Sequence, residues 1–158
     1  MTIQIGAPLP QATFLVMQEN QPVETTTAQL FGSGRHVIFA MPGAYTATCS
    51  ALHIPNVVAH ADALRERGID SISVLTVNDP FALDAWGRDT GADKAGIAMI
   101  ADPAADFSAA IGLTFSVPAR GLLNRSQRYS MLVEDGVVRH LNIEPPCLLY
   151  TSPSPRDA

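Results

Sequence analysis

Cys49 is the residue of this chain best placed to do chemistry. It follows the run Pro-Gly-Ala-Tyr-Thr-Ala-Thr (residues 42–48), which separates an apolar, strand-like run from a helical pattern. A cysteine at a helix start lies beside unpaired N–H groups and the positive end of the helix dipole, and both lower the thiol pKa. Because the thiolate is the nucleophile, this placement predicts a reactive thiol. A buried structural cysteine is the alternative that composition alone favours.

Two neighbours of Cys49 fit the same interpretation. Thr46, three residues earlier, can place its hydroxyl beside the sulfur, and Pro42 provides a rigid turn that can shield a thiolate from water. His53, four residues later, could share a helix face with Cys49 and bind a metal ion. Two ligands without further histidine, cysteine or carboxylate support are too few, so we expect no metal site.

Cys147, the second of the two cysteines, lies in a different context. Four prolines occur between Pro145 and Ala158, and this number forbids a regular helix. The segment is either a flexible tail carrying a mobile thiol or a stretch that does not belong to the natural gene. We favour the second interpretation. We therefore expect residues 1–146 to form the domain and residues 147–158 to be a non-native or disordered tail.

Length and charge limit the possible functions. The chain has 158 residues, enough for one domain with one core, and 47% of them are hydrophobic. The formal net charge is −5 and no run of lysine or arginine occurs, which disfavours nucleic-acid binding. No apolar stretch approaches the roughly 20 residues of a membrane span, and Met1–Pro10 does not resemble a secretory signal. We expect a cytoplasmic protein.

The elements that must position Cys49 alternate along the chain. Uninterrupted apolar runs are typical of strands buried on both faces, and amphipathic stretches between them are typical of helices. The expected strands and helices are Val37–Met41, Ala51–Arg67, Ile72–Val77, 79–91, Ile97–Ala101 and 102–112. Asp79 and Asp102 each precede a proline, which predicts an N-cap followed by a first-turn proline. Trp86 is expected on one apolar face with Phe81 and Leu83, in the core or at a dimer contact.

The end of the chain changes pattern. Tyr129–Glu134 and Val137–Ile143 flank Asp-Gly, a strong indication of a β-hairpin. A further small hairpin is expected from Thr13–Met17 and Gln21–Thr25. The order predicts an α/β, thioredoxin-like, three-layer fold with a central mixed sheet flanked by helices. The last helix expected after the hairpin is missing, which would leave a face of the hairpin exposed.

The residues around Cys49 also carry a resemblance. The spacing Pro-x-x-x-Thr-x-x-Cys in residues 42–49 resembles the active-site motif of the peroxiredoxins. Residues 52–55 (LHIP), 77–81 (VNDPF), 85–87 (AWG) and 125–130 (RSQRYS), followed by Glu-Asp-Gly, are similar to the peroxiredoxin-5 (type II, atypical) branch. The similarity runs from the N-terminus to about Pro145. One departure is Ala47, where this branch usually has proline.

The resemblance implies roles for four residues. Cys49 would be the peroxidatic cysteine, Thr46 would hydrogen-bond the thiolate and the peroxide, and Pro42 would limit access of solvent. Arg128 would supply a permanently charged guanidinium that stabilises the thiolate and the charge developing on the breaking O–O bond. Arg125 either supports the site or is solvated, and we favour the latter.

The implied activity is a thiol-dependent peroxidase for hydrogen peroxide and small alkyl hydroperoxides. Cys49 would become a sulfenic acid. Relatives often resolve it with a cysteine about 25 positions later, where this chain has Val74, or near the C-terminus, close to Cys147. We expect a one-cysteine enzyme without a cofactor, recycled by glutathione with glutaredoxin or by thioredoxin, and a homodimer. The alternative is a redox sensor in which oxidation of Cys49 changes a partner interface without turnover.

Overall fold

The computed structural model describes residues 1–45 and 48–144, and for residues 48–53 it describes the backbone alone. The elements in chain order are β1 (Thr13–Gln18), β2 (Gln21–Thr26), α1 (Thr27–Phe31), β3 (Arg35–Met41), α2 (Thr48–Glu66), β4 (Ser71–Thr76), α3 (Pro80–Thr90), β5 (Ala98–Ala101), α4 (Asp106–Ala110), β6 (Thr114–Val117), the 3₁₀ turn η1 (Pro118–Arg120), β7 (Leu122–Ser126), β8 (Tyr129–Glu134) and β9 (Val137–Ile143). The alternation of strand and helix expected for the middle of the chain is therefore confirmed.

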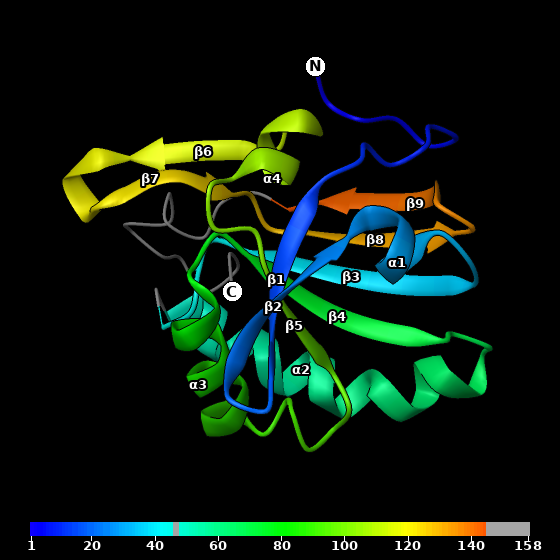
Figure 1. Cartoon of the computed structure of the whole chain (residues 1–158), viewed down its shortest axis with the longest axis horizontal. Helices are drawn as coiled ribbons and strands as arrows, with labels where there is room; N and C mark the ends of the chain where they lie inside the picture. The colour runs from blue at the N-terminus through cyan, green and yellow to red at the C-terminus, as the bar shows by residue number, and fades with distance from the viewer. Residues whose placement is uncertain (46–47, 145–158) are drawn as a thin grey trace, which may run out of the picture.

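A seven-stranded mixed sheet forms the middle layer (Figure 1). Its strand order is β2-β1-β5-β4-β3-β8-β9. β3 pairs in parallel with β4 on one side and antiparallel with β8 on the other. β1 joins the sheet through a pairing of Leu15 with Ala101 of β5, so the N-terminal hairpin is an edge of the main sheet and not a separate unit.

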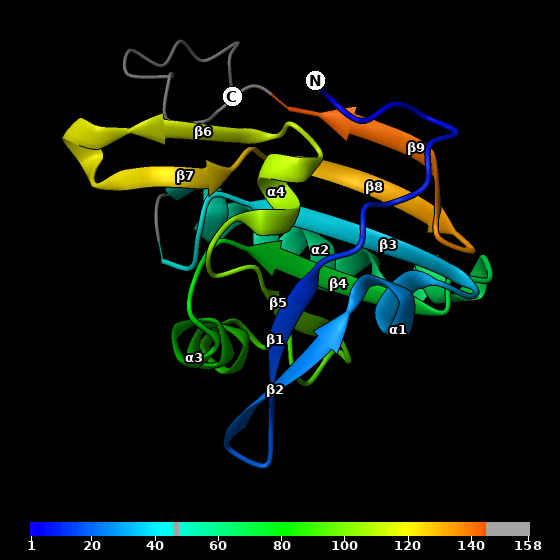
Figure 2. The same ribbon diagram turned by 45° about the horizontal axis from the view of Figure 1, so that its top comes forward.

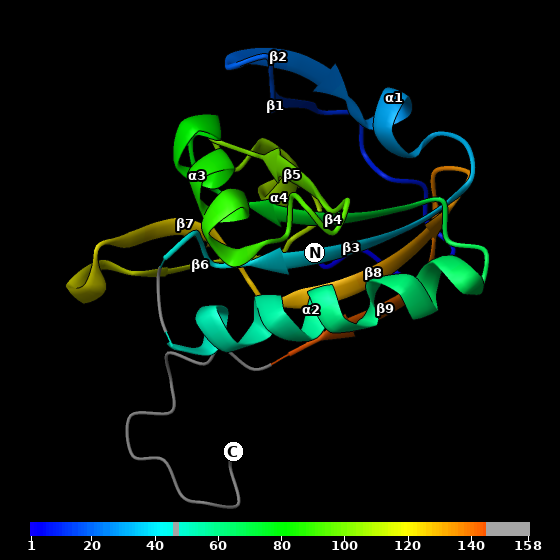
Figure 3. The ribbon, with the colours of Figure 1, turned by 90° about the horizontal axis from the view of Figure 1, so that it is seen from below.

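The two faces of the sheet bury different sets of side chains. In β3, Val37 and Met41 point to one face and Ile38 and Ala40 to the other, as the period-2 geometry of a strand requires. α2 and α3 cover the first face through Ile54, Val57, Ala61, Leu83 and Trp86. α1 and α4 cover the opposite face through Phe31 and Phe107. Figures 2 and 3 show these layers, and the three-layer α/β fold is confirmed.

The two Asp-Pro motifs behave differently. Asp79 is the N-cap of α3: its side chain accepts the Ala82 N–H, Pro80 follows at the first position, and the helix ends at Gly91 in the left-handed conformation. The corresponding prediction for Asp102 is wrong. α4 starts only at Asp106, after Ala105, which has φ 61°, and the residues after Asp102 form a turn.

Asp102 still serves α4, but from the preceding turn. Its buried carboxylate accepts the N–H groups of Phe107 and Ser108 at 3.2 and 2.8 Å and the Ser108 hydroxyl at 2.8 Å. These bonds satisfy donors that a short helix leaves unpaired at its start. Asp102 is therefore not the N-cap that the Asp-Pro motif predicted, although its side chain binds donors in the first turn of a helix that starts at Asp106.

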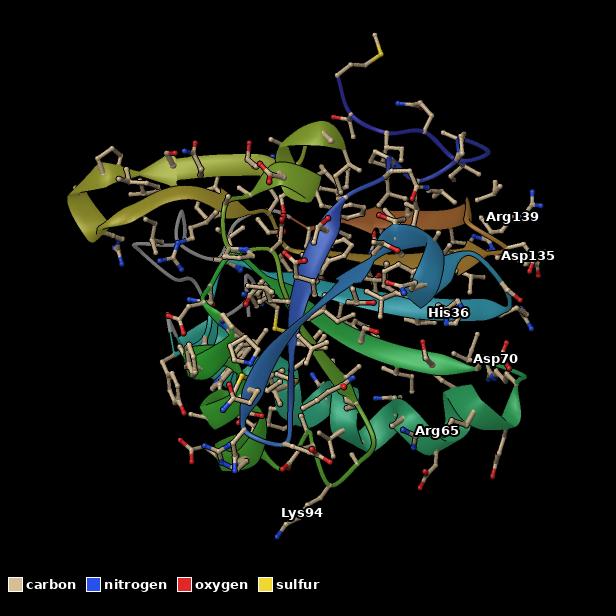
Figure 4. All side chains as sticks on the ribbon, in the orientation of Figure 1. His36, Arg65, Asp70, Lys94, Asp135 and Arg139 are labelled. Atoms are coloured by element: carbon tan, nitrogen blue, oxygen red, sulfur yellow. The ribbon has the colours of Figure 1, made fainter. Side chains whose placement is uncertain are left out.

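The Asp-Gly hairpin was correctly predicted. Asp135 and Gly136 have φ 49° and 79°, the positive values that a tight two-residue turn requires, and β8 and β9 pair antiparallel. Asp135 also accepts the Gly34 N–H at 2.8 Å, and Asp70 accepts the Arg35 N–H at 2.8 Å. Figure 4 shows both carboxylates beside the amino end of β3. This end of the sheet is held by turn residues, which leaves the opposite end for the cysteine loop.

The sequence predicted an exposed face on the last hairpin, now β8 and β9. A groove lies on the α2 side of β3, β8 and β9, lined in part by Val37, Phe39, Leu64 and Leu132. The missing last helix and Cys147 lie outside the described residues. None of the helices in the described part of the chain is long and apolar enough to cross a membrane.

The apolar face predicted for α3 is only partly correct. Trp86 and Leu83 are buried in the core, but Phe81 is 59% exposed. The buried residues of α3 are Pro80, Leu83, Trp86 and Gly87, which share one face of the helix. Phe81 is one residue, about 100° of rotation, from Pro80, so its side chain points away from that face.

Candidate active site

Cys49 lies where the central strand passes into the longest described helix. β3 ends at Met41, and α2 begins at Thr48, so Cys49 is the second residue of the helix. This agrees with the first-turn placement expected from the sequence, where N–H groups and the helix dipole favour a thiolate. Thr46 lies outside the described residues, as do the side chains of residues 48–53.

The start of the loop before Cys49 is buried. Pro42 and Gly43 are buried and Ala44 is half-buried, whereas Tyr45 is 57% exposed. Pro42 is thus buried directly after the end of β3, and its role in shielding the thiolate from water stays a prediction. Tyr45 has φ 60°, so the chain turns sharply just before the helix.

Arg128 reaches the same end of the sheet from β8. Tyr129 pairs with Ala40 in the antiparallel register, and continuing this register by one residue places Arg128 beside Met41. Side chains alternate along a strand, so Arg128 lies on the face that α2 and α3 cover, as Met41 does. Arg128 is only 4% exposed, which argues against an ordinary solvated arginine at a strand end. The Arg128 carbonyl accepts the Glu144 N–H at 2.9 Å, and this bond continues the pairing of β8 with β9.

Arg125 is not solvated, contrary to our expectation. It is half-buried on β7, and its Nη1 donates a hydrogen bond to the Pro42 carbonyl at 3.2 Å. β7 and β6 form a separate two-stranded sheet, which the sequence analysis did not predict. The β6–β7 hairpin extends beyond the end of the main sheet at which β3 ends (Figure 1). Its Arg125 contacts the cysteine loop there through the hydrogen bond to Pro42.

The turn after β4 contributes a second contact that sequence reasoning missed. Asn78 Oδ1 accepts the Ala44 N–H at 2.7 Å. β4 is the parallel neighbour of β3, and the carboxyl ends of parallel strands meet at one edge of the sheet. Pro42 and Asn78 each follow an apolar run predicted to be a parallel strand, and this rule could therefore have predicted that they lie close together.

Tyr45 is bound to α3. Its hydroxyl donates a hydrogen bond to the Asp89 carboxylate, and its ring lies 6.2 Å from the Trp86 ring, centroid to centroid, at 54°. The hydrogen bond to Asp89 and, to a lesser extent, desolvation and the negative charge of Asp89 raise the pKa of the Tyr45 phenol above its usual value. Tyr45 therefore remains a neutral hydrogen-bond donor over the physiological pH range.

The histidines show no catalytic arrangement where they are described. His36 is buried, with its ring nitrogens 2.6 Å from the Ser71 hydroxyl and the Ser33 carbonyl, and so has a structural role. His60 and His140 are exposed. Within residues 1–45 and 54–144 no group of three His, Cys, Asp or Glu side chains is placed to hold a metal ion.

A mixed sheet with a cysteine at the start of the helix that follows its central strand is the arrangement of thioredoxin-like redox proteins. Comparison with known proteins narrows this class. The chain matches the Redoxin family over residues 4–147. It is 37% identical over 145 residues to the hybrid peroxiredoxin hyPrx5 of Haemophilus influenzae, covering 92% of this chain and 59% of that protein. It is 34% identical to peroxiredoxin-2B of Arabidopsis thaliana, covering 90% and 88%.

Solved structures give the same result. The crystal structure of reduced Prx3 from Vibrio vulnificus in complex with H₂O₂ superimposes with a TM-score of 0.85 at 40% identity, covering 92% of this chain and 88% of that one. The chain belongs to the redoxin family and, within it, to the peroxiredoxins. The resemblance stated from the motif around Cys49 is therefore confirmed. The chain spans about three-fifths of the length of the Haemophilus relative.

Proposed function

We propose that this protein is a thiol-dependent peroxidase that reduces hydrogen peroxide and small alkyl hydroperoxides through Cys49. The observation that carries the proposal is the meeting of two elements at one end of the sheet. α2 starts with Cys49 in its first turn, and β8 brings the buried guanidinium of Arg128 to the same face beside Met41. The peroxide complex of the Vibrio vulnificus relative supports the choice of substrate.

The reaction balances with the thiol alone as the redox group. The thiolate sulfur attacks one peroxide oxygen, an S–O bond forms, and the O–O bond breaks. Cys49 is oxidised by two electrons to a sulfenic acid, and the second oxygen leaves as water or an alcohol after taking a proton. Arg128 stabilises the negative charge as it moves onto the leaving oxygen, Thr46 hydrogen-bonds the thiolate and the peroxide, and Pro42 excludes water. No bound metal or cofactor is needed.

An external thiol completes the cycle. It condenses with the sulfenic acid, releasing water and leaving a mixed disulfide on Cys49, and a second thiol clears that disulfide. We propose glutathione with glutaredoxin, or thioredoxin, as the reductant, because no cysteine stands at position 74. Such a cycle suits a reducing compartment, for which we propose the cytoplasm. The domain that performs it is residues 1–146, in keeping with a family match that ends at residue 147.

Peroxide consumption with a thiol reductant tests the proposal. The wild-type protein is expected to consume H₂O₂ with dithiothreitol or with glutathione and glutaredoxin, and Cys49→Ser is expected to be inactive. Arg128→Gln should slow oxidation of Cys49 by about 10²- to 10³-fold, which is the usual effect of removing one preorganised hydrogen-bond donor that stabilises developing negative charge. Arg139→Gln, an exposed arginine on β9, is the matched control and should leave the rate unchanged.

The mass of the intact protein after one equivalent of peroxide identifies the resolving thiol. With glutathione present, an adduct of one glutathione on Cys49 is expected. A loss of two hydrogens without glutathione would show an internal disulfide with Cys147 and overturn external resolution. Unchanged peroxide consumption by Cys49→Ser would refute the peroxidase itself.

A further inference from the structure

The three residues that follow β3 are bound by side chains from two distant parts of the chain. Arg125 Nη1 donates to the Pro42 carbonyl at 3.2 Å, and Asn78 Oδ1 accepts the Ala44 N–H at 2.7 Å. The two bonds flank Gly43, which has no side chain to fix its own orientation. The segment Pro42–Ala44 is thus held at both ends by polar contacts outside its own strand and helix.

These contacts come from elements with independent positions in the fold. Asn78 follows β4 and precedes the N-cap of α3, so its place is fixed by the parallel pairing of β3 with β4. Arg125 lies on β7, where its neighbour Ser126 is fully buried and pairs with Thr114 of β6. Neither side chain depends on the other for its location.

We infer that Arg125 and Asn78 are positioning residues that hold Pro42–Ala44 in place and thereby fix the direction in which Cys49 presents its sulfur to a peroxide. The inference rests on the proposed peroxidase function. Neither residue is assigned contact with the substrate. Attack on an O–O bond requires the sulfur, the attacked oxygen and the leaving oxygen to be aligned, and a displacement of about 1 Å can cost about 100-fold in rate.

The guanidinium suits this task better than an ammonium group would. A planar fork of donors has a fixed direction, so it fixes the carbonyl that it binds, whereas a lysine is a flexible point charge. Asn78 contributes an acceptor without a charge, so it binds the Ala44 N–H without opposing a thiolate nearby. An aspartate would retain the acceptor but add a negative charge beside the loop.

Four single variants test the inference in the full-length protein: Arg125→Gln, Arg125→Lys, Asn78→Ala and Asn78→Asp. The readout is the second-order rate constant for oxidation of Cys49 by H₂O₂, compared with alkylation by iodoacetamide after correction for the thiolate fraction. Alkylation at saturating pH reports access to the sulfur with a weaker demand for alignment. Arg120→Gln, exposed on the same hairpin, and Asn142→Ala, exposed on β9, are the controls.

The expected result is selective. Arg125→Gln and Asn78→Ala should each lower the rate with H₂O₂ by about 10- to 100-fold and change corrected alkylation by less than about twofold. Arg125→Lys should recover part of the loss. Asn78→Asp should recover the alignment but raise the measured pKa of Cys49. In the double variant Arg125→Gln/Asn78→Ala, the rate with H₂O₂ should fall by little more than in the slower single variant. The two losses should not multiply, because both residues act on one segment.

Other results would overturn the inference. Rates with H₂O₂ that match the two controls would show that the contacts do not position the thiol. Equal losses in oxidation and alkylation would show a merely structural role. The proposed function is judged separately, on the wild-type protein: if wild-type Cys49 reacts with H₂O₂ no faster than a free thiol, the peroxidase fails. The inference would then fail as well, whereas a fast wild-type protein with variants that match the controls would overturn the inference alone.

Discussion

Tyr129 carries a phenol into the core next to the residue that supplies the guanidinium. It is 1% exposed, and its hydroxyl has no hydrogen-bond partner among the described residues. Burial and, secondarily, the negative charge of Asp102 raise the pKa of Tyr129 far above its usual value of about 10. The small side chain of Ala40, its partner on β3, gives the ring space over the sheet.

Removing the Tyr129 hydroxyl should therefore stabilise the fold. We expect Tyr129→Phe to raise the free energy of unfolding by about 1 kcal/mol near neutral pH, because a buried hydroxyl without a partner costs on the order of 1–3 kcal/mol. Denaturation in urea measures this change. A variant destabilised by 1 kcal/mol or more would contradict the expectation.

The same residue should make the fold sensitive to alkali. In the unfolded chain Tyr129 loses its proton near pH 10, whereas in the folded protein it keeps it, so above pH 10 the unfolded state binds fewer protons. Stability then falls as pH rises, by up to about 1.4 kcal/mol per pH unit from this residue. Tyr129→Phe should show a shallower decline between about pH 9.5 and 11, measured by the same urea titrations. An identical decline in both proteins would contradict this origin.

At the scale of elements, α4 depends on a carboxylate that lies outside it. The helix has five residues, too few to be stable alone, and Asp102 binds three of the donors at its start. Asp102→Ala should cost about 2–3 kcal/mol of unfolding free energy, since hydrogen bonds to a buried charged group are worth about 1.5–3 kcal/mol. Asp106→Ala, exposed in the first turn of the same helix, should cost less than about 1 kcal/mol. Equal costs for the two variants would remove this role from Asp102.

Local rules predicted the elements whose causes are local. Asp79 with Pro80, and Asp135 with Gly136, act through bonds within a few residues, so sequence alone placed the start of α3 and the β8–β9 turn correctly. The same reasoning placed α4 too early, because Asp102 reaches forward five and six residues to its N–H donors and leaves Pro103 in a turn.

The contacts that sequence patterns did not predict join residues that lie far apart in the chain. α1 and the β6–β7 hairpin are short and show little hydrophobic periodicity. The one local signal for α1 was the capping box of Thr26 and Gln29 at its start, which was overlooked. Arg125 binds a carbonyl 83 residues away and Asn78 an N–H 34 residues away. Such contacts follow from the order of strands in the sheet, which becomes available only with the fold. Arg128, by contrast, was proposed from its motif and Cys49 from its place at a helix start, and their catalytic roles stay predictions.

At the scale of the whole molecule, exposed apolar side chains gather on the elements around the cysteine loop. Tyr45, Phe81 and Leu123 are 57%, 59% and 60% exposed, on the loop, the first turn of α3 and β7 respectively. α3 contacts the loop through Asp89 and Trp86, which bind Tyr45, and β7 contacts it through Arg125. We propose that these side chains lie in the contact of the homodimer that the peroxiredoxin resemblance implies, because contiguous exposed apolar surface is typical of protein–protein contacts.

Two charged substitutions should weaken that dimer. We expect the wild-type protein to sediment as a dimer at about 50 µM, and Phe81→Asp with Leu123→Asp to shift it toward monomer, because a buried unpaired carboxylate costs several kcal/mol. Ile5→Asp, 61% exposed near the N-terminus, is the control and should leave the dimer intact. Sedimentation velocity over a range of concentrations measures the shift. A wild-type protein that is monomeric throughout would contradict the proposed dimer.

The register of β8 against β3 also sets which insertions and deletions relatives of this protein can accept. The pairing of Arg35 with Glu134 continues without a shift to Ala40 with Tyr129, and Arg128 occupies the next position. Adding or deleting one residue within β8 would turn Arg128 to the face of α1 and α4, away from Cys49. Changes in length should therefore accumulate in the β6–β7 hairpin and in the turn after α3, while the number of residues from Arg128 to Glu134 stays constant.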